Sequence, residues 1–227
     1  MSNLLDCVLP LATFDRQHVL KRVDDQDRTA VRRRELEAFV TRRFAETYGA
    51  DPKHFMPQLL GLYRNDLLQA VVGLRPASVG PLFLEQYLDL PASTLIRLRS
   101  GMPVQHPQVV EVGNLAALAP GAARMLITAL THYLAALGFT WVVFTGTAML
   151  LNSFQRLNLS PIDLGLADPA RLGEQQADWG SYYATRPRVM AGYIPEGLAQ
   201  LIQRDAFARL GYQFMYAQQE ELAHVSA

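Results

Sequence analysis

The hydrophobic pattern of the chain changes period several times, and these changes predict alternating strands and helices. Residues 8–14 are predicted as a strand, residues 22–28 as a charged loop, and Thr29 as the N-cap of a helix that stops at Gly49. This helix carries an apolar stripe at helical spacing: Leu36, Phe39, Val40, Phe44 and Tyr48. Residues 58–64 and 67–74 flank Asn65 and Asp66, which predicts a β-hairpin.

The second half of the chain alternates strand and helix patterns. Residues 82–88 and 91–98 are predicted as short helical pieces ahead of a strand from Val109. The next elements are a helix at residues 120–137 that stops at Gly138, a buried strand at 139–145, a helix capped by Thr147, strands at 161–165 and 188–194 around a loop at 167–180, and a helix at 198–210. Strand, helix, strand, helix predicts a parallel pair with a right-handed crossover.

Residues 109–126 hold the most informative chemistry, because an acid interrupts an apolar strand. Period-two alternation places Glu111 and Gly113 on one face of this strand and Asn114 on the other. An ionisable group on a strand of core character needs a partner or a task. Pro120 fits a first helical turn whose next amides are open to a phosphate. An ordinary strand-to-helix turn is the alternative for this segment.

Several other polar positions have two interpretations. Arg75 closes a hairpin strand, where Gly73 marks a bulge or a close approach; a surface arginine is the alternative. His132 lies off the apolar stripe of its helix and is predicted at the surface. The first predicted helix carries arginines that form either a solvated face or a contact for an acidic partner such as a carrier protein: Arg32, Arg33, Arg34, Arg42 and Arg43.

Composition narrows the class of protein. The 227 residues are 50% hydrophobic, enough for one substantial domain, and the balance of 21 basic and 21 acidic residues predicts no nucleic-acid partner. The single cysteine, Cys7, excludes an internal disulfide framework and a cysteine-rich zinc site, and no metal is expected. The N-terminal residues lack a signal-peptide pattern, and the longest charge-free stretch, residues 138–155, is too polar for a membrane span. The expected location is the cytoplasm.

Several blocks of the sequence resemble the thermostable hemolysin family, in the family's order and from about Leu11 to Gly197: VEVGNLAAL, PGAARML, LGFTWVVFTGT, LLNSFQRLNLSPIDLGLADPARL and WGSYY. The strand order is also similar to the acyl-CoA N-acyltransferase (GNAT) superfold. Within it, VVEVGNLAAL and VVGLRPAS resemble the glutamate-bearing strand and the preceding glycine and arginine strand of acyl-homoserine-lactone synthases. The resemblance implies an α/β fold with a GNAT-like mixed central sheet flanked by helices, in one domain over residues 1–210 with a C-terminal tail at 211–227.

The same resemblance implies an acyltransferase. The donor would be a thioester, either acyl-CoA or acyl-phosphopantetheine on an acyl carrier protein, and the acceptor a small-molecule amine. Glu111 would bind or deprotonate the amine through a water, with Arg75 as its charge partner and Asn114 beside it in the catalytic set. The residues implied in donor binding are Leu115, Ala117, Leu118, Gly121, Ala122, Ala123, Arg124, Asn152 and Arg156.

The sequence departs from the superfold at two points. The helix start has Gly121 among alanines in place of a glycine-rich run, and Phe154 stands where a tyrosine often protonates the leaving thiolate. Tyr182 or Tyr183 could substitute; otherwise the leaving group needs no protein acid or the chain is inactive. Two other functions therefore stay open, a membrane-active hemolysin without enzymatic activity and a catalytically silent thioester-binding module. Aromatic residues after position 210 leave the oligomeric state open.

Overall fold

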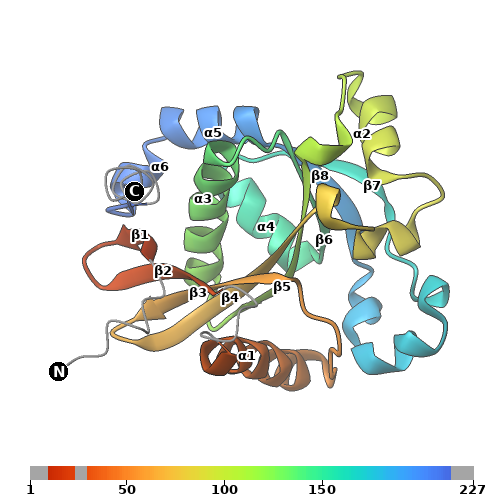
Figure 1. The fold of residues 1–227 in the computed structure, drawn as a ribbon, viewed down its shortest axis with the longest axis horizontal. Helices are drawn as coiled ribbons and strands as arrows, with labels where there is room; N and C mark the ends of the chain where they lie inside the picture. The colour runs from red at the N-terminus through yellow and green to blue at the C-terminus, as the bar shows by residue number, and fades with distance from the viewer. Residues whose placement is uncertain (1–9, 24–29, 216–227) are drawn as a thin grey trace, which may run out of the picture.

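The described part of the chain forms one nine-stranded mixed sheet in the order β7-β8-β6-β5-β4-β3-β2-β1-β9 (Figure 1). This computed structural model describes residues 10–23 and 30–215. Strands β5 and β6 pair in parallel, and the other neighbouring strands pair antiparallel. The strands are β1 Pro10–Phe14, β2 His18–Val23, β3 Gln58–Arg64, β4 Leu67–Pro76, β5 Val109–Ala117, β6 Trp141–Gly146, β7 Ile162–Leu166, β8 Arg188–Tyr193 and β9 Gln213–Phe214.

Helices cover both faces of this sheet. Alternate residues of β3 point to opposite sides: Leu59 packs with the core under helix α1, and Leu60 packs with the core under helix α3. Figure 1 shows α1 and α3 on the two sides of the strands β3 and β4. The helices are α1 Ala30–Tyr48, α2 Ala92–Ser100, α3 Pro120–Ala136, α4 Ala148–Arg156, α5 Ile194–Gln203 and α6 Ala206–Arg209.

Local turn chemistry sets most element ends as the sequence predicts. Asn65 and Asp66 turn the β3–β4 hairpin with φ values of 49° and 61°, the left-handed conformation that a two-residue hairpin loop of this type requires. Helix α3 begins at Pro120, and Gly138 follows its end at φ 82°. The Thr147 hydroxyl caps α4 by accepting a hydrogen bond from the Leu150 amide at 3.4 Å.

Other element predictions need correction. Strand β2 was not predicted, and the helix predicted at residues 198–210 is interrupted at Asp205, whose φ of 53° separates α5 from α6. The predicted loop at 167–180 contains the 3₁₀ turns of η5, Pro169–Trp179. Beyond residue 210, β9 pairs with β1, so the chain after the predicted domain boundary joins the sheet. The predicted cap Thr29 and Cys7 lie outside the described residues.

The predicted surface position of His132 holds only in part. Its ring is partly buried, with its centroid 4.3 Å from that of Phe214 and 5.7 Å from that of Tyr212. Burial lowers the pKa of His132 below its ordinary value. The side of α3 that carries His132 is covered by the chain after α6, which the pattern within one helix does not reveal.

Strands β5 and β6 separate halfway along their length. Their parallel pairing runs from Val109 opposite Trp141 to Val112 opposite Phe144 and ends there, although β5 continues to Ala117 and β6 to Gly146. We call the gap between these unpaired strand ends the splay. Backbone groups beyond Val112 and Phe144 therefore no longer join the two strands, and the sheet opens between them.

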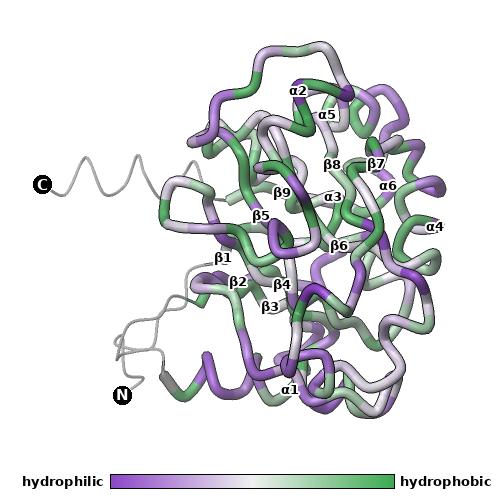
Figure 2. The backbone as a smooth tube through the Cα atoms, turned by 90° about the vertical axis from the view of Figure 1, so that its right-hand side faces the viewer, coloured by the Kyte–Doolittle hydropathy of each residue, from purple (hydrophilic) through white to green (hydrophobic). Residues whose placement is uncertain are grey.

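Many residues of α1 are hydrophilic, as the purple segments of the tube at the lower edge of Figure 2 show. Its arginines pair along the helix, as in Arg32 with Glu35 at 3.2 Å and Arg33 with Glu37 at 2.8 Å. In the described residues, no helix combines the length and the apolar character that crossing a membrane requires.

Candidate active site

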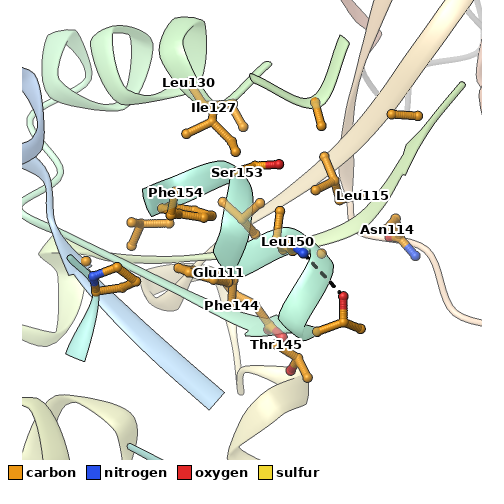
Figure 3. Close-up of a pocket in the computed structure, with 18 of the residues that line it drawn as sticks. Glu111, Asn114, Leu115, Ile127, Leu130, Phe144, Thr145, Leu150, Ser153 and Phe154 are labelled. Atoms are coloured by element: carbon orange, nitrogen blue, oxygen red, sulfur yellow. Dashed lines mark hydrogen bonds between the residues drawn. The ribbon is translucent and has the colours of Figure 1, made fainter. Parts of the chain in front are cut away.

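A cavity of about 540 Å³ occupies the splay and extends between the helices on either side (Figure 3). This volume lies in the ordinary range for small-molecule sites. The cavity touches both strands of the splay and the helices α1, α3, α4 and α5. Among the residues predicted for the site, its lining includes Arg75, Glu111, Asn114, Leu115, Ala117, Leu118 and Ala123.

Glu111 is the buried carboxylate of this cavity, with 3% of its surface exposed. Its Oε2 accepts a hydrogen bond from the Phe83 amide at 2.7 Å, and its Oε1 accepts one from the Leu84 amide at 3.0 Å. Both amides open the 3₁₀ turn η3, Phe83–Tyr87, which fixes the carboxylate on the floor of the cavity. Burial outweighs these donors and raises the pKa of Glu111 to about 7.

Arg75 lies opposite Glu111 in the β4–β5 register, as its predicted role as a charge partner requires. Its positive charge lowers the pKa of Glu111, by less than burial raises it. The Arg75 Nη1 donates to the Pro81 carbonyl at 3.2 Å. Arg75 therefore acts on Glu111 by its charge from the neighbouring strand, while its guanidinium holds the loop that leads into η3.

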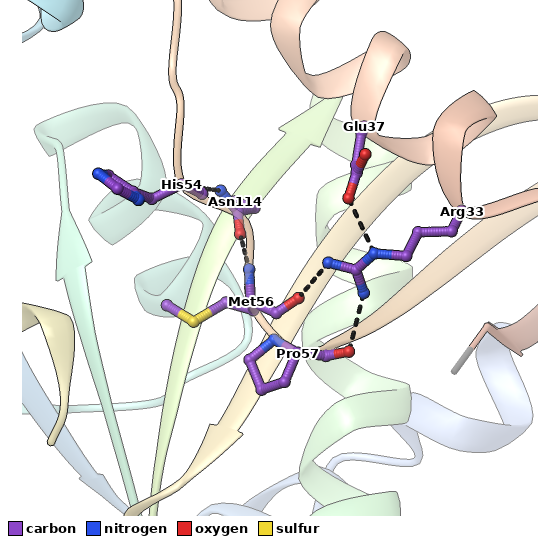
Figure 4. Close-up of polar contacts among 6 residues, drawn as sticks. All are labelled: Arg33, Glu37, His54, Met56, Pro57 and Asn114. Atoms are coloured by element: carbon purple, nitrogen blue, oxygen red, sulfur yellow. Dashed lines mark hydrogen bonds and ion pairs between the residues drawn. The ribbon is translucent and has the colours of Figure 1, made fainter. Parts of the chain in front are cut away.

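Asn114 does not face away from Gly113 as strict alternation predicts. Between Val71 opposite Ala116 and Gly73 opposite Gly113, β4 has one residue and β5 has two, so β5 contains a bulge. Asn114 occupies the bulge at φ 51°. Its Oδ1 accepts from the Met56 amide at 2.8 Å and its Nδ2 donates to the His54 carbonyl at 3.1 Å, on the α1 side of the sheet (Figure 4).

The side chain of Met56 explains why positions 73 and 113, on the paired strands β4 and β5, are both glycine. A Cβ at Gly73 would lie 2.6 Å from the Met56 Cβ, and one at Gly113 would lie 2.5 Å from its Cε. The predicted close approach at Gly73 is therefore confirmed. Arg33 of α1 fixes the same segment by donating to the carbonyls of Met56 at 3.0 Å and Pro57 at 2.8 Å (Figure 4).

Aromatic rings form one side of the cavity next to Glu111. They come from the end of α1, from η3 and from the chain around the 3₁₀ turn η6, Tyr182–Thr185. Ring centroids lie 6.1 Å apart for Phe83 and Trp179, and 5.2 Å apart for Tyr48 and Tyr182. We call the following six of the rings that line the cavity the aromatic wall: Phe44, Tyr48, Phe83, Tyr87, Trp179 and Tyr182.

The opposite end of the cavity is apolar. Ile127 and Leu130 of α3 face Ser153 and Phe154 of α4 in Figure 3. Phe154 stacks on Phe144 of β6 at 4.7 Å with the ring planes 6° apart. Beyond them, the cavity reaches Gly197 of α5 and a polar pair in which the Asn158 Nδ2 donates to the Gln200 Oε1 at 3.1 Å. A long apolar group can therefore extend from the splay toward α5.

Residues 26–198 match the sequence profile of a family described as "Thermostable hemolysin". The chain belongs to the thermostable hemolysin family. The match spans most of the described fold, including both strands of the splay. No curated protein sequence matches this hemolysin-family chain.

Solved structures similar to this hemolysin-family protein include acyl-transferring synthases. FeeM, an N-acyl amino acid synthase from uncultured soil microbes, has a TM-score of 0.55 at 15% identity, over 81% of this chain and 94% of FeeM. BjaI, a CoA-dependent acyl-homoserine lactone synthase solved with SAM and isopentyl-CoA, has a TM-score of 0.52 at 14% identity, over 81% and 87%. LasI, an acyl-homoserine lactone synthase, has a TM-score of 0.50 at 12% identity, over 82% and 91%. These likenesses show the fold, which is α/β and GNAT-like.

Part of the predicted donor site lies away from the cavity of this hemolysin-family protein. The cavity lining does not include Gly121, Ala122, Arg124, Asn152 or Arg156. The amides of Ala122 and Ala123 donate to the Ala119 carbonyl at 3.1 and 3.3 Å, and the Leu118 amide donates to the Gln69 carbonyl at 2.9 Å. The phosphate cradle at the start of α3 stays a prediction. These three amides already donate hydrogen bonds to backbone carbonyls of the protein.

Apart from Tyr182, the aromatic wall is a part of the site that the sequence did not indicate. Phe44 and Tyr48 lie at helical spacing on the apolar stripe of α1, so they have the pattern of core residues. In the described residues, no group of three or more His, Cys, Asp or Glu side chains is placed to hold a metal ion. The site therefore consists of one buried acid between an aromatic wall and an apolar end.

Proposed function

We propose that this protein transfers an acyl group from a thioester, carried by coenzyme A or by a phosphopantetheine arm, to the amine of a small molecule. The observation that carries the proposal is Glu111, a carboxylate buried to 3% exposure that reaches the cavity where the splay opens. A carboxylate with a pKa of about 7 can accept a proton from an amine at neutral pH. The fold shared with acyl-transferring synthases supports the same reaction.

The two ends of the cavity suit two substrates. The apolar end between α3 and α4 suits the acyl chain, since its walls are side chains such as Ile127, Leu130 and Phe154. The aromatic wall suits the acceptor, because rings attract a cationic amine before it is deprotonated. The thioester carbonyl would then lie in the splay, between the two ends and within reach of Glu111. Amine nitrogen and carbonyl carbon form the new bond as the carbon–sulfur bond breaks.

The donor could be free or bound to a carrier protein, and three of the five arginines of α1 that could meet an acidic carrier are already paired. Arg32, Arg33 and Arg43 each pair with a glutamate of the same helix, so their charges are largely balanced. The test offers both donors, as acyl-CoA and as acyl-carrier protein, with a panel of amines. Free thiol and acylated amine, detected by a thiol reagent and mass spectrometry, support the proposal. Absence of both products in every pairing would overturn it.

The rate of acyl transfer is expected to rise with pH through about 7. Below this value Glu111 is protonated and cannot accept a proton; above it the carboxylate is free to act. The measurement is kcat/KM against pH with excess acceptor, for the wild type and for Glu111→Gln. We expect the step near 7 in the wild type and not in the residual activity of the variant. The same step in both proteins would assign it to another group.

The Gly197→Leu variant is expected to prefer shorter acyl donors. A Cβ at Gly197 would lie 3.5 Å from the Leu159 Cδ2 and 3.6 Å from the Thr131 Cγ2, so a methyl group fits and a larger side chain fills the end of the cavity. The measurement is kcat/KM over a series of chain lengths. Gly197→Ala is the matched control and should keep the wild-type order. A uniform loss at all lengths would contradict this placement of the acyl chain.

A further inference from the structure

The proposed reaction leaves one proton unassigned. When the carbon–sulfur bond breaks, the electron pair leaves with sulfur, and an alkyl thiolate is a poor leaving group unless a proton reaches it. The position implied for this acid on α4 holds Phe154, which stacks on Phe144 and has no hydroxyl. The proton must therefore come from another side chain that reaches the splay or from solvent.

Tyr48 reaches the splay from a different element. It is the last residue of α1, and its side chain lines the cavity. Thr147, the residue that caps α4 directly after β6, lines the same cavity, and its side chain lies close enough to the Tyr48 phenol to lower the pKa of Tyr48, by less than burial raises it. Thr145, the residue before the last of β6, also lines the cavity. The Tyr48 phenol thus lies on the β6 side of the splay, and Glu111 approaches from the β5 side.

The chain around Gly180 holds Tyr48 in this position. The Tyr48 carbonyl accepts hydrogen bonds from the Ser181 amide at 2.8 Å and from the Ser181 Oγ at 3.0 Å. Its ring packs edge-on against Tyr182, with centroids 5.2 Å apart and planes at 88°. Gly180 comes so close that a Cβ there would lie 2.2 Å from the Tyr48 carbonyl oxygen. Contacts to backbone and ring together leave the phenol little freedom to leave the splay.

The two tyrosines predicted from the sequence for this role are less suited to it. The Tyr183 hydroxyl is hydrogen-bonded to that of Tyr87 at 2.5 Å, and Tyr183 does not line the cavity. Tyr182 is enclosed by the rings of Phe44, Tyr48 and Trp179. Burial raises the pKa of Tyr48 above its ordinary value, so its phenol keeps its proton at neutral pH.

We infer that Tyr48 is the acid of the reaction and donates its hydroxyl proton to the leaving sulfur. This inference rests on the proposed function. In the full step, the bound amine has first lost its ammonium proton to solvent; Glu111 then takes a proton from the neutral amine, the carbon–nitrogen bond forms, the carbon–sulfur bond breaks, and the sulfur leaves as a thiol. Solvent then returns a proton to the Tyr48 phenolate, and Glu111 releases its proton to solvent. No oxidant, metal or further reactant enters the balance.

The test compares two leaving groups in the full-length Tyr48→Phe variant. With an alkyl thioester donor we expect a loss of about 100-fold in the acyl-transfer rate, and with an aryl thioester, which leaves as a stable thiolate, a loss below about threefold. A merely structural role would reduce both rates equally. Equal losses on the two donors, or no loss on either, would overturn the assignment.

Two further variants serve as controls for the comparison of the alkyl and aryl donors. Tyr182→Phe, in the same aromatic wall, should show no difference between the two donors. Thr147→Ser keeps both the cap of α4 and a hydroxyl beside the Tyr48 phenol, so it should leave the ratio of the alkyl and aryl rates at its wild-type value. Wild-type protein inactive with both donors would refute the proposed function itself, whereas active wild type with donor-independent losses refutes only the role of Tyr48.

Discussion

Replacing Glu111 by glutamine is expected to slow acyl transfer by about 10³-fold, the size of effect that a general base contributes. The amide has nearly the shape of the carboxylate but cannot accept the amine proton. One of the two amides from Phe83 and Leu84 keeps an acceptor in the glutamine oxygen, so η3 should stay in place. Single-turnover rates measure the loss, and equilibrium binding of a non-transferable thioester analogue should remain within about threefold of wild type.

Glu85→Gln is the matched control for this experiment. Glu85 lies in the same 3₁₀ turn, and its Oε1 accepts from the Ala92 amide at 2.8 Å, away from the reacting groups. This variant changes the charge near Glu111 and should leave the transfer rate within a few-fold of wild type. A Glu111→Gln protein that keeps wild-type turnover would refute the base role and favour a silent binding module.

Gly180→Ala is expected to destabilise the protein strongly and to reduce acyl transfer at the same time. Gly180 has φ 49° and ψ −127°, a backbone conformation that L-residues avoid. Its Cβ would also lie 2.2 Å from the Tyr48 carbonyl oxygen and 2.7 Å from that of Gly49, so the chain at 180 must move away from the end of α1. Thermal unfolding and the alkyl-thioester rate measure the two effects.

Gly173→Ala separates the effect of the backbone conformation from the effect of the steric clash with the Tyr48 carbonyl oxygen. Gly173 has nearly the same backbone conformation, φ 56° and ψ −128°, yet nothing lies within 4 Å of its Cβ position. We expect it to cost about 1–3 kcal/mol and a few degrees in Tm, without loss of activity per folded molecule. Gly180→Ala should lose at least about twice as much stability. Equal losses for the two variants would mean that contact with Tyr48 plays no part.

Elements governed by local sequence were predictable, and those governed by distant pairing were not. The β3–β4 hairpin, α3 and the cap of α4 follow from residues adjacent in the chain, such as Asn65, Pro120 and Thr147. Strand β9 forms through pairing with β1, nearly the whole chain away, and nothing in its own two residues indicates this. The break at Asp205 likewise depends on a left-handed backbone conformation. Aspartate also occurs within helices, so the residue type alone does not indicate the break.

The acid of the site could be predicted from the sequence, but most of the side chains around it could not. Glu111 was conspicuous because a charge interrupts an apolar strand, and its partner Arg75 follows from the strand before it. The face of Asn114 was not predictable, since a bulge changes the alternation without changing the residue types. The aromatic wall comes from segments far apart in sequence, as with Phe44 and Trp179, and only folding brings these rings together.

The bulge in β5 also bears on how such a binding site can arise. Between the pairs Val71–Ala116 and Gly73–Gly113, β5 has a single residue more than β4. That residue bends the strand near the point where its pairing with β6 ends. Deleting it would restore regular alternation in the pairing of β5 with β4. A single extra residue in one strand thus accompanies the change from a closed sheet, useful only as a scaffold, to an open one with room for a substrate.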